Sequence, residues 1–247
     1  MVALVWALAV AVAAADAAAR PGLARRHGGA RACAGRVSAA AVPAAVDGPR
    51  PGLLYAAARW YDGRLTAAPL LTKSATSGCV SCVGDALAQF SKTATFVADS
   101  THVFDARRSA AFALLGALYF GPFLHFWYNA LARLEVRWRR RGMRKPEVVA
   151  IQLVLNQSVG AGIVNAGFFF MFAFAQSALA PYSSPTPLID ARAAFRANYR
   201  NVMFANWIIW PIPSLLNLWF VPLQYRVAYT NCVAVVWKFV LSLLTTR

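Results

Sequence analysis

Acidic residues are scarce in this sequence, and the common motifs of soluble enzymes are missing. Only 9 of the 247 residues are Asp or Glu, against 25 Lys and Arg, so the formal net charge is +16. We find no GxSxG, HExxH, P-loop or dinucleotide-binding pattern. No nucleic-acid-binding motif accompanies the basic charge. We therefore predict that the chain is not an enzyme, binds no cofactor or metal, and has no nucleic-acid partner.

Cysteine is also rare, with four residues in the chain. Cys79 and Cys82 form a CxxC pair, a pattern that can mark a redox or zinc site. No second CxxC exists, and the pair lies inside an apolar stretch that is typical of a helix. The sequence favours two small thiols one helical turn apart over a redox or zinc site.

Apolar residues are abundant instead. The chain is 59% hydrophobic and 14% charged, whereas soluble domains are about 45–50% apolar and about 25% charged. The charged residues gather in tails and short loops between apolar runs, as in membrane proteins. We predict an all-α fold, a multi-span transmembrane helical bundle with four to five spans.

The first fifty residues differ from the rest of the chain. They are rich in Ala and Arg, hold only two acidic residues, and resemble an organelle transit peptide. An apolar run followed by Ala-Asp-Ala also resembles a signal peptide, and a disordered tail is the third alternative. We divide the chain into a targeting or disordered leader (1–50) and a membrane helical bundle domain (51–247).

The apolar runs after the leader have the length of membrane spans, for which about 20 residues suffice. A short amphipathic helix is predicted at Leu53–Thr66. The predicted spans are Leu70–Phe90, Arg108–Leu131, Val148–Leu179, Val202–Val221 and Tyr225–Leu244. Residues 91–107 are predicted as a polar loop and Arg133–Lys145 as a basic loop. The third run is longer than a bilayer requires, so it tilts or projects.

The fourth run is broken at Trp210-Pro211. Proline removes a backbone donor and disfavours helix before it, so this run is either a kinked span or a re-entrant half-helix. A separate interfacial helix is predicted before it, at Asp190–Arg200. With five crossings, the leader, the basic loop and the Gln224–Arg226 turn share one side, which the positive-inside rule assigns to the matrix, stroma or cytosol.

Polar residues recur inside the predicted spans at helical spacing. Ser74, Gly78, Ser81, Asp85 and Gln89 share one helical face. Such stripes either join helices or line a hydrated passage. A carboxylate within a span must be protonated, paired or in contact with water, and we consider His125, Lys73 or an arginine such as Arg226 as the partner of Asp85. The pore-lining or gating candidates are Ser81, Asp85, Gln89, His125, Asn129, Gln152, Asn156, Trp210, Pro211, Asn217, Arg226 and Asn231.

Three motifs together resemble a known family. Gly84-Asp85 with Gln89 resembles GDxxxQ, and Gly116 to Leu131 resembles GxxxxGPxxHxWYxxL. Asn206 to Trp237 resembles NWxxWPxxxxxNxxxVPxxxRxxxxNxxxxxW. Over residues 53–244 the chain is similar to the Mpv-seventeen and 22-kDa peroxisomal membrane protein family. The chain departs from the family pattern at Asn156, where Asp is usual, at Gly162, where Pro is expected, and at Ser214, where Gln is expected.

The resemblance implies a small organelle membrane protein, and several family members are similar to weakly selective channels. The leading hypothesis is a channel for small solutes or metabolites that contributes to organelle homeostasis. A non-conducting scaffold or assembly protein is the alternative, and an enzyme using Asp85 and His125 is a third. The expected partners are the lipid bilayer and small solutes, with a homo-oligomer left open. The Arg-rich leader and the lack of a peroxisomal SKL-type end favour the mitochondrial inner membrane or a plastid over the peroxisome.

Overall fold

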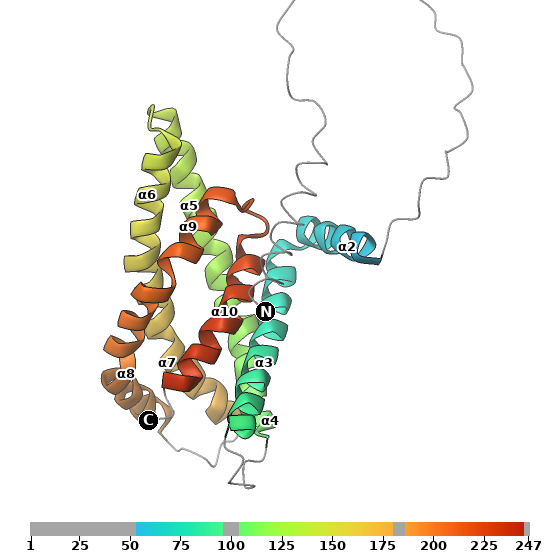
Figure 1. Cartoon of the computed structure of the whole chain (residues 1–247), viewed down its shortest axis with the longest axis vertical. Coiled ribbons are helices and arrows are strands. Elements are labelled where there is room, and N and C mark those ends of the chain that lie inside the picture. Colours follow the sequence, from blue (N-terminus) through green and yellow to red (C-terminus); the bar gives the residue numbers. More distant parts are fainter. Residues whose placement is uncertain (1–52, 96–103, 180–185, 245–247) are drawn as a thin grey trace, which may run out of the picture.

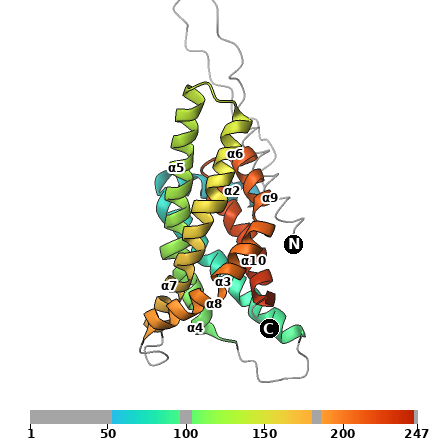
Figure 2. The same ribbon diagram turned by 90° about the vertical axis from the view of Figure 1, so that its left-hand side faces the viewer.

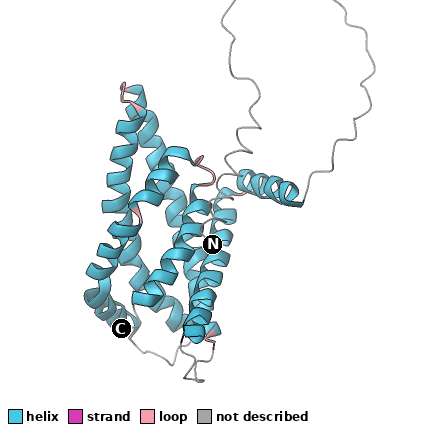
Figure 3. Ribbon diagram, in the orientation of Figure 1, coloured by secondary structure: helices cyan, strands magenta, loops and turns pink. Residues whose placement is uncertain are grey.

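The computed structural model of the chain describes residues 53–95, 104–179 and 186–244. Every regular element in these ranges is a helix (Figure 3), so the all-α prediction is confirmed. The leader predicted at 1–50 lies outside the described residues. In chain order the elements are α2 (Leu53–Ala67), α3 (Pro69–Thr95), α4 (Ala106–Leu115), the π turn η1 (Gly116–Phe120), α5 (Gly121–Arg140), α6 (Lys145–Leu155), the π turn η2 (Asn156–Gly160), α7 (Ala161–Leu179), α8 (Pro187–Ile209), α9 (Pro211–Phe220) and α10 (Arg226–Leu244).

Helix α2 lies crosswise to the long helices, beside the start of α3 (Figure 1). Pro69 begins α3, because proline needs no hydrogen-bond partner in the first turn of a helix. The Asp62 carboxylate accepts hydrogen bonds from the Tyr225 hydroxyl at 2.8 Å and from Gln224 Nε2 at 3.1 Å. These bonds fix α2 to the α9–α10 turn. The helix predicted at 53–66 is therefore confirmed, and it lies at the same end of the bundle as that turn.

Two uninterrupted helical stretches form the long axis of the bundle. Ala106–Arg140 and Lys145–Leu179 each contain 35 residues, and each passes through one π turn. They meet in a hairpin that reaches beyond the other helices (Figure 2). The basic loop predicted at Arg133–Lys145 is wrong, since α5 continues to Arg140. Arginine is a good helix former and is favourable in a last turn, near the negative end of the helix dipole. The turn follows at Gly142, whose φ is 87°.

The fourth apolar run is also longer than predicted. Residues 190–200 do not form a separate interfacial helix, because α8 is continuous from Pro187 to Ile209. The axes of α8 and α9 differ by 53° across the break at Trp210-Pro211. Pro211 occupies the first position of α9 and forces this bend. Together the two helices extend along the length of the bundle (Figure 1).

By length and hydropathy, two helical stretches in the described part of the chain are able to cross a membrane. They are Ala106–Arg140 and Lys145–Leu179, and the bent pair α8–α9 makes a third if it counts as one span. The prediction of a membrane bundle is thus supported with two to three spans. The four to five spans of the sequence analysis are not confirmed by these criteria.

Small residues form the seam between α3 and the α4–η1–α5 stretch. A Cβ atom on Gly116 would overlap the Ser77 carbonyl, and one on Gly121 would lie 2.6 Å from Ser74 Cα. In a π turn the backbone bonds run from i to i+5, so Gly116 and Gly121 both face α3. Such contacts let helix backbones approach closely, as in other membrane bundles.

A buried polar node joins α5, α9 and α10. Asn217 Nδ2 donates to the Tyr128 hydroxyl at 3.0 Å, to Thr230 Oγ1 at 3.0 Å and to the Arg226 carbonyl at 3.3 Å. Asn217 is 1% exposed. Because buried amides need partners, this node fixes the angle between the last two helices.

Replacing Asn217 with alanine is expected to lower the free energy of unfolding by about 2 kcal/mol, since a buried amide with several partners is lost. Thermal unfolding of the purified protein in detergent measures the change. Asn198→Ala is the matched control, because Asn198 is exposed and its amide donates to the Ala194 carbonyl of its own helix. Equal losses in the two variants would contradict the structural role of the node.

Candidate functional site

A cavity of about 110 Å³ lies between α3, α5, α7, α8, α9, α10 and the two π turns. Polar and aromatic side chains from all of these elements reach it. The lining residues are Val80, Ser81, Phe120, Phe123, Leu124, Trp127, Tyr128, Asn156, Gln157, Gly160, Ala161, Val164, Asn165, Asn206, Trp210, Ser214, Thr230, Asn231, Ala234 and Trp237.

A chain of hydrogen bonds between side chains follows one wall of the cavity. Trp127 Nε1 donates to Asn156 Oδ1 at 2.8 Å, and Asn156 Nδ2 donates to Ser214 Oγ at 3.1 Å. Gln157 Nε2 also donates to Ser214 Oγ, at 3.1 Å. The series of hydrogen bonds continues to Asn206, whose Nδ2 donates to Gln157 Oε1 at 3.1 Å. We call this set of residues the amide wall.

The second π turn explains how neighbouring residues reach the same wall. In an α-helix, successive side chains point about 100° apart, so Asn156 and Gln157 would diverge. The wider turn of η2 lets both side chains reach Ser214. Gly160, at the end of η2, leaves room for the Trp127 ring, since a Cβ atom there would lie 2.8 Å from that ring.

The structure brings four of the sequence-predicted residues to the cavity, namely Ser81, Asn156, Trp210 and Asn231. Sequence reasoning missed Gln157, Asn165, Ser214 and Thr230 as candidate site residues, together with the aromatic groups of Trp127, Tyr128 and Trp237. Helical periodicity does not select Gln157, because the π turn η2 changes the spacing there. A run of adjacent amides, Asn156-Gln157, was the available signal.

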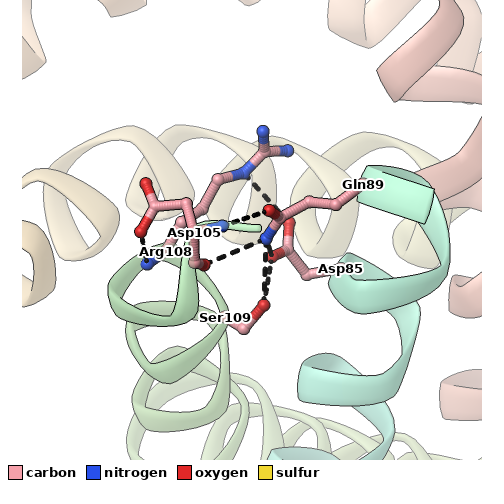
Figure 4. A network of polar contacts seen from close by, with 5 residues as sticks. All are labelled: Asp85, Gln89, Asp105, Arg108 and Ser109. Atoms are coloured by element: carbon pink, nitrogen blue, oxygen red, sulfur yellow. Dashed lines mark hydrogen bonds and ion pairs between the residues drawn. The ribbon is translucent and has the colours of Figure 1, made fainter. Parts of the chain in front are cut away.

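Asp85 lies in a separate polar cluster where α3 meets α4 (Figure 4). Its carboxylate forms an ion pair with Arg108 Nε at 3.0 Å and accepts a hydrogen bond from Ser109 Oγ at 2.8 Å. Gln89 Nε2 donates to the same carboxylate at 2.8 Å, while Gln89 Oε1 accepts from the Asp105 backbone N–H at 2.8 Å. The Asp105 carboxylate caps α4 through the Arg108 N–H.

The structure places Asp85 and Gln89 at the contact between α3 and α4. The ion-pair partner of Asp85 is an arginine, one of the predicted alternatives, but it is Arg108 instead of Arg226. Asp85 is 2% exposed and does not line the cavity. A buried carboxylate with an ion pair and two donors is satisfied by protein groups. In this structure Asp85 and Gln89 hold two helices together.

His125 and Asn129 belong to a third group, also away from the cavity. His125 Nδ1 lies 3.4 Å from Lys73 Nζ, and His125 Nε2 lies 3.2 Å from Asn129 Nδ2. Asp85 and His125 thus have different neighbours, and neither of them lines the cavity. An enzyme site built on these two residues, the third hypothesis above, is not assembled here.

The remaining predicted candidates make packing contacts instead of lining the cavity. Gln152 Nε2 donates to the Leu131 carbonyl at 2.9 Å. Arg226 donates to the Val221 carbonyl at 3.1 Å and to the Leu218 carbonyl at 3.2 Å. Pro211 begins α9, and Asn217 forms the node described above. In the described part of the chain, no three His, Cys, Asp or Glu residues are grouped so that they could hold a metal ion.

Two departures from the family motifs meet in space. The resemblance leads us to expect Asp at the position of Asn156 and Gln at that of Ser214, and the side chains of these two residues are hydrogen-bonded at 3.1 Å. All members of the amide wall are uncharged.

Comparison with known proteins identifies the family. A sequence model described as the Mpv17 / PMP22 family matches residues 186–242. The mitochondrial inner membrane protein Mpv17 of Drosophila melanogaster is 31% identical, over 67% of this chain and 89% of the relative. Protein SYM1 of Gibberella zeae is 31% identical, over 74% of this chain and 94% of the relative. The Bos taurus mitochondrial inner membrane protein Mpv17 is 28% identical. No solved structure matches the chain. With this identity over most of both chains, and with the three motifs on adjoining helices, the chain belongs to the Mpv17 / PMP22 family.

Proposed function

We propose that this protein is a passive, weakly selective channel for small solutes and that the central cavity is part of the conduction path. The observation that carries the proposal is a cavity of about 110 Å³ in the middle of the bundle, lined on one side by amides and hydroxyls. A cavity of this size, polar on one side, is large enough to hold about three to four waters, at a liquid volume of ~30 Å³ each.

The polarity of the lining favours a wet cavity. Empty cavities in proteins are apolar, whereas waters stay where two to four polar partners are available. The amide wall offers both donors and acceptors within a short distance. In lipid, irregular or polar surfaces are tolerated only against protein or water. These features favour a transport path over a fully packed bundle.

We further propose five spans, with α3, the two long stretches, the bent pair α8–α9 and α10 each crossing once. In the structure, the basic α5–α6 hairpin, α2 and the α9–α10 turn lie toward one end of the bundle (Figure 1). This arrangement agrees with five crossings and with the positive-inside rule. Relatives that are named mitochondrial inner membrane proteins support an inner mitochondrial location, with the basic end in the matrix.

A non-conducting scaffold is the second candidate function, and a specific observation favours it. Most of the predicted pore residues are used as joints between helices, including Asp85, Asn217 and Arg226. Polar groups that bond across the contact between two helices act as glue between them. The two functions differ in whether the cavity conducts.

Replacing Ala234 with leucine is the direct test, because Ala234 lines the cavity and the larger side chain fills it. Release of small solutes from liposomes that contain the purified protein is expected to fall several-fold, since the space for water decreases. Ala150→Leu is the matched control, because Ala150 is exposed on α6. Wild-type liposomes that release no more solute than empty ones would support the scaffold.

A further inference from the structure

We infer that the cavity accepts uncharged, hydrogen-bonding solutes and rejects ions, and that Asn156 is a specificity-determining residue for this preference. The inference rests on the proposed channel function. It assigns a chemical class to the solute, namely small neutral molecules with hydroxyl or amide groups.

The lining supplies hydrogen bonds without charge. None of the described residues that line the cavity is Asp, Glu, Lys or Arg. Amide and hydroxyl side chains both donate and accept, so they match solutes that carry both kinds of group. The aromatic groups, such as Trp127 and Trp237, cover the apolar side of a small solute.

An ion in this cavity would have no counter-charge. Moving an ion out of water is costly unless it meets an opposite charge or complete hydrogen bonding. The buried carboxylate of Asp85 lies outside the lining and is already paired with Arg108. Cations therefore gain no carboxylate ligand from the amide wall, and anions meet no cationic side chain in the lining.

The buried guanidinium of Arg226 lies outside the lining, beside the α9–α10 turn, where it donates to the Val221 and Leu218 carbonyls. Thr230 lines the cavity, and its hydroxyl donates to the Arg226 carbonyl at 2.8 Å. Arg226 is 7% exposed, and Glu135 is the acidic group that acts on it. Arg226 adds no attraction for cations from this side.

At position 156, replacing the side-chain NH2 group of asparagine with the second carboxylate oxygen of aspartate would make the neutral amide wall negatively charged. Asn156 Oδ1 accepts from Trp127 Nε1, and its Nδ2 donates to Ser214 Oγ. Aspartate has the same shape and keeps the acceptor for Trp127, and the Ser214 hydroxyl is able to turn and donate to it. Asn156→Asp therefore changes the charge of the cavity with little change in packing.

The test measures flux of glycerol, urea, potassium and chloride across liposomes that contain the full chain, at about pH 8, well above the ordinary carboxyl pKa of about 4. The wild-type protein is expected to release glycerol and urea faster than either ion. Asn156→Asp is expected to raise potassium flux relative to glycerol by about tenfold, because a fixed negative charge attracts cations at short range. Asn198→Asp is the control that adds the same charge on the exposed face of α8.

Each outcome has a separate meaning. A wild-type protein that passes neutral solutes and ions equally, or an ion preference that Asn156→Asp leaves unchanged in correctly folded protein, would overturn the inference while leaving the channel intact. If Asn156→Asp does not fold, the order of the four wild-type fluxes decides the inference without it. If the wild-type protein passes none of the four solutes, the channel itself is refuted, and the inference with it.

Discussion

Replacing Gly116 with valine is expected to lower the free energy of unfolding by about 3 kcal/mol, the upper end of the range for overpacked cores. For a chain of this length, about 3 kcal/mol corresponds to a fall of roughly 6–12 °C in the unfolding midpoint. The reason is that a side chain at Gly116 overlaps the Ser77 carbonyl, which is backbone and cannot rotate away. Helices α3 and α4 would have to separate along the whole seam.

Gly63→Ala is the matched control for this prediction. Gly63 also lies within a helix, but a Cβ atom there meets no other atom within 4 Å. Alanine is favoured over glycine in helices by about 1 kcal/mol, so this variant should be unchanged or slightly more stable. Thermal unfolding in detergent, followed by size-exclusion chromatography, compares the two variants. A Gly116→Val protein as stable as the wild type would show that α3 and α4 do not pack as described.

Replacing Asp85 with asparagine is expected to lower the free energy of unfolding by about 2 kcal/mol while leaving the ion preference unchanged. Breaking a buried ion pair costs about 3–5 kcal/mol. We expect a smaller loss because the Arg108 side chain is 32% exposed and is able to turn toward water. Asparagine also keeps the shape of the side chain and one acceptor for Ser109.

The surface pair Arg144–Glu147 provides the control for Asp85. The two side chains are 81% and 41% exposed, and exposed pairs contribute about 0–1 kcal/mol, so Glu147→Gln should have a small effect. An Arg108→Gln variant, alone and combined with Asp85→Asn, measures the coupling between the partners of the buried pair. If Asp85→Asn changed the ion preference without a loss of stability, Asp85 would not act mainly by joining α3 to α4. Such a result would place Asp85 in the conduction path.

Much of the fold was predictable because helical membrane segments are marked by long apolar runs. The segments at 53–66 and 225–244 agree with α2 and α10 to within one residue at each end. The segment at 70–90 lies within α3, which continues to Thr95, so the polar loop predicted at 91–107 is wrong over residues 91–95. The structure differs from the prediction where charged residues predict a loop and a helix is present instead. Arg133 to Arg140 continue α5, since a helix that extends beyond the lipid needs no apolar residues.

The candidate site was less predictable, for a reason visible on α3. The five residues from Ser74 to Gln89 do share a face, and that face packs against the α4–η1–α5 stretch. Periodicity identifies a polar face, but it does not distinguish a face against another helix from one against a cavity. Nor does it reveal a π turn, which brings both Asn156 and Gln157 to Ser214.

The contact between α3 and α10 has a consequence for biogenesis. Asn231 Nδ2 donates to Ser77 Oγ at 2.7 Å, across 154 residues of sequence. Ser77 is 0% exposed and Asn231 is 5% exposed, so the bond lies in the buried contact between the two helices. This bond forms only after α10 has been synthesised and has packed against α3. The buried face of α3 at Ser77 is therefore completed late in synthesis, by a helix that is far away along the sequence.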